Sequence, residues 1–196
     1  MLLKEILIGF DIREMEYSYQ DSWSQDRKET FLIIGNIIKP LSTDRDVWNS
    51  IFTMYENLKQ NLPSWTNPWE NLFEMTSYTD KIWKDHWKPS WIIGITLLSG
   101  VNLIAYDHVI PSGLEKNWMF LGYDVSDKYL LSGLTNCGYK PEEISLLKNK
   151  WKNHLNKYHL FDDPESATQF TNIANQRVPE HAPFNVYGLY LIEEHL

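Results

Sequence analysis

The sequence predicts an α+β protein with a mainly antiparallel sheet packed by several helices, and residues 1–196 are expected to form a single globular domain. Strand-like alternation of apolar residues occurs near both ends and in the middle of the chain. Helical periodicity lies between these strands without the regular alternation that parallel α/β folds show. A chain of 196 residues, 43% of them apolar, is long enough to bury one sizeable core.

The N-terminal part is predicted to contain two strands and a helix. Residues Leu3 to Ile12 alternate in apolar character, and Phe31 to Ile38 form a second short apolar run closed by Pro40. The polar residues 13–30 between them are expected to form a surface loop or a ragged hairpin. From Thr43 to Leu62 the apolar residues recur at helical spacing, which predicts a core-facing amphipathic helix.

Tryptophans are dense in the next segment. Trp65 and Trp69, like Trp83 and Trp87, are four residues apart and would share a helix face. Because tryptophan buries a large area, we expect most of them to pack in the core. The alternative is a sugar-stacking or peptide-binding surface across residues 65–91.

Three consecutive antiparallel strands are expected in the middle of the chain. Trp91 to Leu98 and Val101 to Val109 are apolar runs separated by Ser99-Gly100, which predicts a hairpin. The third strand, Trp118 to Val125, should be central in the sheet, since both of its faces begin apolar. Strict alternation would place Phe120 and Tyr123 on opposite faces.

An acidic corner follows this third strand. Asp124, Ser126 and Asp127 can accept hydrogen bonds from neighbouring amides and so fix a turn. A metal site or a catalytic carboxylate pair would need a third partner, such as His108. We favour the structural turn.

The C-terminal part has the clearest helix signals. A helix should begin at Pro141, with Glu142 and Glu143 in its first turn at the positive end of the macrodipole. Asp163 is expected to cap a second helix starting at Pro164. A final strand, residues 184–192, is apolar on both faces and is predicted to lie in the middle of the sheet.

Composition excludes several classes of function. A net charge of -8 argues against nucleic-acid binding and against docking on an anionic membrane, while it favours basic partners. One cysteine excludes an internal disulfide framework and is typical of the reducing cytoplasm. Neither a signal peptide nor a transmembrane segment is expected.

Specific catalytic signatures are missing. The sequence contains no glycine-rich phosphate loop, nucleophile elbow or dinucleotide fingerprint, so no cofactor is expected. Cys137 is interpreted as a buried inert thiol, because no histidine stands in a recognisable catalytic context. His154 and His159 are five residues apart, a poor spacing for two metal ligands on one helix.

The segment Phe120 to Tyr139, FLGYDVSDKYLLSGLTNCGY, resembles one found in bacterial immunity proteins of contact-dependent growth inhibition and polymorphic toxin systems. The similarity covers about a tenth of the chain. The matching residues are Gly122, Tyr123, Asp124, Asp127, Ser132, Gly133, Leu134, Asn136, Cys137, Gly138 and Tyr139.

The resemblance implies a cytoplasmic protein without catalytic machinery that neutralises a cognate toxin by occluding its active site or substrate groove. The toxin would be basic, and a nuclease fits that charge. The part of this segment from Gly122 to Tyr139 is expected to be a structural corner. The expected contact surface is the acidic and aromatic stretch 14–29, with Asp162 and Asp163 as a second candidate. In the first stretch the expected contact residues are Glu14, Glu16, Asp21, Trp23, Asp26 and Glu29.

Two alternatives come from other functional classes. A small hydrolase could use Asp124, Asp127 and His108, which would then have to converge in a cleft. A carbohydrate- or peptide-binding module would instead require several of the tryptophans in 65–91 to be exposed. The sequence does not indicate an oligomeric state.

Overall fold

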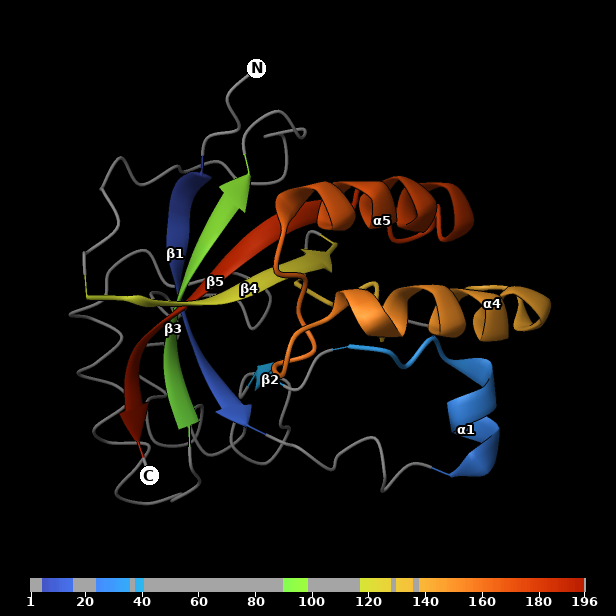
Figure 1. Ribbon diagram of the computed structural model, residues 1–196, viewed down its shortest axis with the longest axis horizontal. Coiled ribbons are helices and arrows are strands. Elements are labelled where there is room, and N and C mark those ends of the chain that lie inside the picture. Colours follow the sequence, from blue (N-terminus) through green and yellow to red (C-terminus); the bar gives the residue numbers. More distant parts are fainter. Residues whose placement is uncertain are drawn as a thin grey trace, which may run out of the picture.

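A five-stranded antiparallel sheet, in the order β2-β1-β3-β5-β4, forms one layer of the computed structural model (Figure 1). The structure describes residues 5–15, 24–35, 38–40, 90–98, 117–127, 130–135 and 138–195. The strands are β1 (Glu5–Met15), β2 (Ile38–Pro40), β3 (Ser90–Leu98), β4 (Met119–Ser126) and β5 (Asn185–His195). All neighbouring pairs are antiparallel, and helices pack on the sheet, so the predicted α+β class is confirmed.

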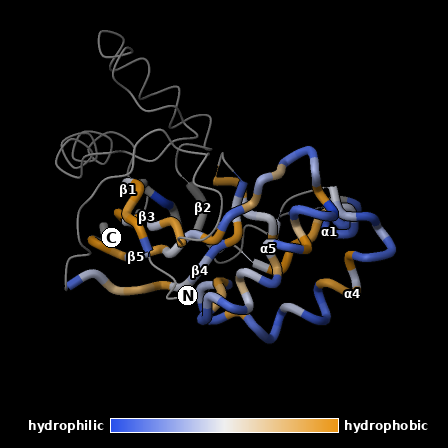
Figure 2. The backbone as a smooth tube through the Cα atoms, turned by 90° about the horizontal axis from the view of Figure 1, so that it is seen from above, coloured by the Kyte–Doolittle hydropathy of each residue, from blue (hydrophilic) through white to orange (hydrophobic). Residues whose placement is uncertain are grey.

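The helices within the described residues are α1 (Gln25–Thr30), α4 (Pro141–Trp151) and α5 (Pro164–Arg177), with the short turn η4 (Lys152–His154) after α4. Helix α5 packs against β4 and β5. Trp151 of α4 meets Phe170 of α5 edge to face, with ring centroids 5.5 Å apart. Figure 2 shows hydrophobic residues gathered along the strands and hydrophilic residues along much of α4. Ile144 and Trp151 of α4 and Phe170 of α5 are buried, so these helices present their apolar sides inward.

Both predicted C-terminal helices are confirmed, and their ends follow the local signals. Pro141 opens α4, and the Asp163 carboxylate caps α5 by accepting a hydrogen bond from the Ser166 amide at 2.7 Å. Helix α4 ends at Trp151 and is followed by the turn η4, so Leu155 lies beyond the helix, in the loop that returns to the sheet.

The order of the strands corrects one prediction and confirms another. β5 lies between β3 and β4, as expected for a strand that is apolar on both faces. β4 was predicted to be central but is an edge strand. Its outer side is covered by short segments instead of a strand: Phe161 exchanges backbone hydrogen bonds with Tyr123, and the Gly133 amide donates to Val125. This cover explains the apolar sequence at an edge.

A bulge in β4 corrects the predicted assignment of faces. The register against β5 shifts between Phe120 and Gly122, and Gly122 has a φ of +140°. One extra residue in the strand reverses the alternation beyond it. Phe120 and Tyr123 therefore lie on the same side of the sheet, with ring centroids 4.8 Å apart.

Two predictions in the N-terminal part were also wrong. The segment 31–35 has no strand, and the short strand β2 lies further on and includes Pro40, paired with Arg13 of β1. Pro40 is tolerated because β2 is at the edge of the sheet. The expected loop or hairpin at 13–30 contains the helix α1. The predicted helix 43–62, the strand 101–109 and the tryptophans at 65, 69, 83 and 87 lie outside the described residues.

The buried Tyr139 joins the turn at Gly133 to helix α5, where it packs near Phe170. We expect this tyrosine to make the stability of the fold depend on pH. Its hydroxyl donates to the Gly133 carbonyl at 2.9 Å, and burial raises the pKa of Tyr139 above its usual value. The unfolded chain would therefore ionise at about pH 10 while the folded chain stays protonated, so stability falls as pH rises above about 10. Tyr139→Phe should lower the free energy of unfolding by about 1 kcal/mol at neutral pH. It should also make the decrease of that free energy above pH 10 shallower, by up to about 1.4 kcal/mol per pH unit. Urea unfolding between neutral pH and about pH 11 measures this, and parallel pH curves for the two proteins would contradict it.

Candidate functional site

Glu5, at the start of β1, is the centre of a hydrogen-bonded cluster that joins four strands. Its carboxylate accepts hydrogen bonds from Tyr123 of β4 at 2.6 Å, from Tyr190 of β5 at 2.5 Å and from Thr96 of β3 at 2.9 Å. Burial, and then the hydrogen bond and charge of Glu5, raise the pKa of both tyrosines. Both hydroxyls are therefore protonated at neutral pH, so they act as hydrogen-bond donors and cannot serve as general bases.

Exposed apolar side chains lie on the edge strand beside this cluster. Met119 is 44% exposed and Phe120 is 39% exposed. The Phe120 ring packs on the rings of Tyr123 and Tyr190, with centroids 4.8 and 5.1 Å away. The aromatic group is therefore held in place by residues that Glu5 fixes, while part of its surface faces solvent.

Two carboxylates lie close to the same edge strand. The Asn156 amide nitrogen donates both to the Leu121 carbonyl and to the Asp162 carboxylate, each at 2.8 Å, so Asp162 lies close to β4. The charge of Asp163 contributes to raising the pKa of Tyr123, which places Asp163 near the Glu5 cluster. The hydrogen bond from the Ser166 amide lowers the pKa of Asp163, so this carboxylate is ionised at neutral pH.

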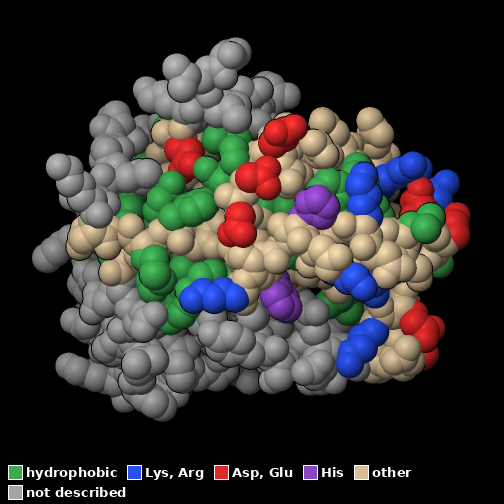
Figure 3. Space-filling model, viewed as in Figure 1, with side chains coloured by type: hydrophobic (Ala, Val, Ile, Leu, Met, Phe, Trp, Pro, Cys, Tyr) green, Lys and Arg blue, Asp and Glu red, His purple; other side chains and the backbone are tan. Residues whose placement is uncertain are grey.

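We call Met119, Phe120, Asp162 and Asp163 the β4–α5 patch. Figure 3 shows acidic and hydrophobic side chains side by side on this face, over β4 and the start of α5. An exposed aromatic group beside fixed negative charges is a suitable surface for a basic protein.

The structure describes only some of the contact residues predicted in the acidic stretch 14–29. Asp26 and Glu29 are exposed on α1, which Figure 1 places at the end of the molecule away from the sheet. Glu14 is described only by its backbone pairing with Lys39 of β2 and Ser90 of β3. Glu16, Asp21 and Trp23 lie outside the described residues. Asp162 and Asp163, the second candidate, are both exposed, and hydrogen bonds of Asn156 place Asp162 close to β4.

The corner at Asp124 has the geometry of a structural turn. Asp124 is 1% exposed and accepts hydrogen bonds from the Val125 amide and from the hydroxyls of Ser126 and Ser132, at 2.8, 3.1 and 2.7 Å. Burial raises the pKa of Asp124, while these hydrogen bonds and the positive charge of buried Arg13 act in the opposite direction. The hydrolase hypothesis required this carboxylate to face a cleft, and its role in the turn argues against that hypothesis.

Asp127 is also buried, and both of its carboxylate oxygens have partners within the fold. One of its oxygens accepts from the Leu131 amide at 3.0 Å, and the other lies 3.2 Å from His181 Nδ1. His108, the third residue of the hydrolase hypothesis, lies outside the described residues. Trp91, at the end of the tryptophan-dense region, is buried and meets Tyr158 edge to face, as expected for a core residue.

Sequence reasoning missed Glu5 and Tyr190 as parts of the surface. The only signal was a carboxylate standing inside the apolar run MLLKEILI, where a charged group requires partners. Those partners lie 91, 118 and 185 residues away along the chain. Their identity could not be read from local pattern.

Comparisons with protein families, with curated proteins and with solved structures found no match to this chain. Among the described residues, no three His, Cys, Asp or Glu side chains are grouped as a metal site would need. A search of the same residues for helices long and apolar enough to span a bilayer found none.

Proposed function

We propose that this chain is a non-catalytic cytoplasmic immunity protein that binds a basic bacterial toxin, in the simplest case a nuclease, and blocks its active site or substrate groove. The observation that carries the proposal is the β4–α5 patch, where exposed Phe120 lies in the edge strand to which Asn156 ties Asp162, and where the neighbouring Asp163 is ionised. The net charge of -8 supports a basic partner, because the field of the whole molecule would speed their encounter.

The patch is built to bind at low entropic cost. Phe120 is packed against two tyrosines that Glu5 holds, and Asp162 and Asp163 are fixed by hydrogen bonds from Asn156 and Ser166. Side chains that are already ordered lose little freedom when a partner docks. Phe120 would act as the apolar anchor, and the carboxylates would pair with Lys or Arg at the rim.

Most of the segment that resembles immunity proteins is buried and holds the strand that carries Phe120 in place. Asp124, Asp127, Ser132, Leu134 and Tyr139 are buried in the structure. They form the corner that ends β4 and so fix the position of the edge strand. Within the proposal, the part of this segment from Gly122 to Tyr139 is structural, and the toxin contact lies on the adjacent surface, which includes Phe120.

A binding experiment tests the proposal with two variants that preserve the fold. The protein encoded by the adjacent reading frame would be co-expressed, and the affinity of the complex measured at two salt concentrations. Asp162→Asn with Asp163→Asn removes both charges while keeping an acceptor for Asn156 and a good helix cap. We expect affinity to fall about tenfold and the dependence on salt to become shallower. Phe120→Ser should mainly accelerate dissociation.

Asp26→Asn with Glu29→Gln on α1 is the matched control, since it removes the same charge from the surface first predicted from sequence. It should leave binding unchanged. If the α1 variant alone weakens the complex, the contact lies at α1. If no complex with a basic protein forms at all, the proposed function is wrong.

A further inference from the structure

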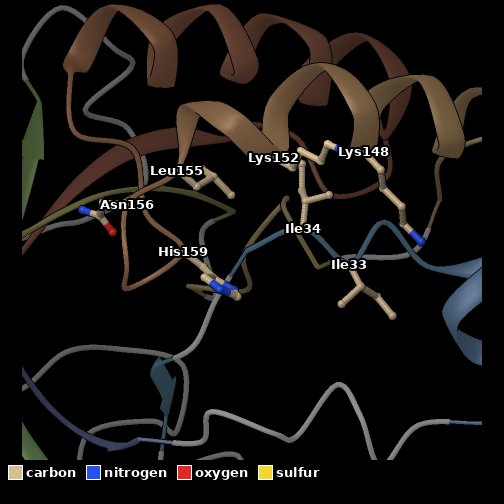
Figure 4. Close-up of a pocket in the computed structure, with 7 residues that line it drawn as sticks. All are labelled: Ile33, Ile34, Lys148, Lys152, Leu155, Asn156 and His159. Atoms are coloured by element: carbon tan, nitrogen blue, oxygen red, sulfur yellow. The ribbon is translucent and has the colours of Figure 1, made fainter.

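A pocket of about 440 Å³ lies between the end of α4 and the segment 31–35. Figure 4 shows its lining side chains, which come from two stretches of the chain, 33–34 and 148–159. They are Ile33, Ile34, Lys148, Lys152, Leu155, Asn156 and His159. The volume falls within the range of small-molecule sites, roughly 300–1,000 Å³. The lining shares no residue with the β4–α5 patch, although its Asn156 donates a hydrogen bond to Asp162 of that patch.

Two lysines give the pocket a positive wall. Lys148 Nζ donates to the Lys28 carbonyl at 2.7 Å, a bond that uses one of the three N–H donors of the ammonium group. Burial lowers the pKa of Lys148, although the nearby Glu29 carboxylate partly opposes this. Lys152, one turn further on, is exposed at the pocket mouth. A half-buried ammonium group beside a second cation would be stabilised by a bound anion.

The opposite wall is formed by a loop that one side chain holds in place. The Asn156 amide oxygen accepts from the Tyr158 and Leu160 amides, and its nitrogen donates to the Leu121 carbonyl and to Asp162. This network presents His159, whose backbone has a φ of +55°. His159 Nδ1 is buried and has no hydrogen-bond partner among the described residues. Such an unsatisfied atom beside a pocket is unusual in a protein interior.

The remaining lining is apolar and comes from Ile33, Ile34 and Leu155. A purely inorganic anion would leave this surface without contacts. The two lysine charges are offset in part by Glu29 and by the negative C-terminal end of α4, so the local excess of positive charge is small. A single negative charge on an apolar body matches this lining better than a multiply charged phosphate.

We infer that this pocket is a binding site for a small organic monoanion, a carboxylate whose charge lies between Lys148 and Lys152 and whose apolar body packs on Ile33, Ile34 and Leu155. The inference is independent of the toxin contact. It assigns the site a ligand class, an aromatic or short aliphatic carboxylate.

Titration calorimetry and NMR with benzoate as the probe test this inference, with benzyl alcohol as its uncharged counterpart and inorganic phosphate as a small anion. Benzoate should bind at millimolar concentration or tighter, and benzyl alcohol about tenfold more weakly. Benzoate should shift the imidazole resonances of His159. Lack of saturation by benzoate, or equal affinity for benzyl alcohol, would overturn the site. Phosphate binding as tightly as benzoate would show general attraction to lysines and would also overturn it.

Charge variants locate the site. Lys148→Met should weaken benzoate binding about tenfold. Lys152→Gln, at an exposed position where the fold is not at risk, should weaken it severalfold. Lys140→Met removes the same charge at the other end of α4 and should have no effect. If Lys140→Met and Lys152→Gln behave alike, the pocket is not the binding site.

Discussion

Replacing Gly122 by alanine is expected to lower the free energy of unfolding by about 3 kcal/mol or more, because two independent effects add at this position. Gly122 has a φ of +140°, which L side chains rarely adopt. A Cβ atom there would lie 2.6 Å from Leu160 Cβ and 2.9 Å from the Phe161 carbonyl oxygen. Neither neighbouring atom can move without shifting the backbone.

The structural consequence is loss of the cover on the edge strand. Phe161 exchanges two backbone hydrogen bonds with Tyr123, and this contact requires the two segments to approach closely at Gly122. Alanine would push the loop 156–161 away from β4 and so disturb the β4–α5 patch. Urea unfolding measures the stability, and toxin binding measures the patch.

Gly133→Ala is the matched control. A Cβ atom at Gly133 would lie 3.1 Å from the nearest atom of the buried Phe184 ring, so the neighbouring atoms would have to shift by only a few tenths of an ångström. The free energy of unfolding should fall clearly less in Gly133→Ala than in Gly122→Ala. A loss below about 0.5 kcal/mol for Gly122→Ala would show that the bulge does not constrain the fold as described.

Replacing Asp124 by alanine should also have a large effect: we expect it to lower the free energy of unfolding by about 3–5 kcal/mol. Three hydrogen-bond donors would lose their acceptor in a buried corner: the Val125 amide and the hydroxyls of Ser126 and Ser132. The positive charge of buried Arg13 would also lose a nearby carboxylate. Chemical denaturation with far-UV circular dichroism provides the measurement.

Asp124→Asn separates packing from charge. The amide oxygen can still accept from Val125 and Ser132, and the amide nitrogen can donate to the Ser126 hydroxyl. The free energy of unfolding should therefore fall about half as much as in Asp124→Ala. Equal stability of wild type and alanine variant would show that the carboxylate does not support the turn. In that case the hydrolase hypothesis, in which Asp124 is retained for chemistry, would regain support.

The candidate site was predictable in part. Asp163 was identified as a helix cap and Asp162 and Asp163 as a candidate acidic surface, because capping and charge are visible in neighbouring residues. Phe120 was assigned to the wrong side relative to Tyr123, because the bulge depends on how β4 pairs with β5. A single extra residue reverses the alternation, and its position is decided by a partner strand far along the chain.

The sequence by itself determined the α+β class, the helices starting at Pro141 and Pro164, and the use of Asp124 in a turn. Each follows from interactions within a few residues: periodicity, capping and turn hydrogen bonds. The tertiary structure decided that β5 separates β3 from β4, that Glu5 meets Tyr123 and Tyr190, and that a pocket forms beside Lys148. These features depend on pairing between distant segments, and many registers satisfy the same local pattern until the whole sheet and its helices pack together.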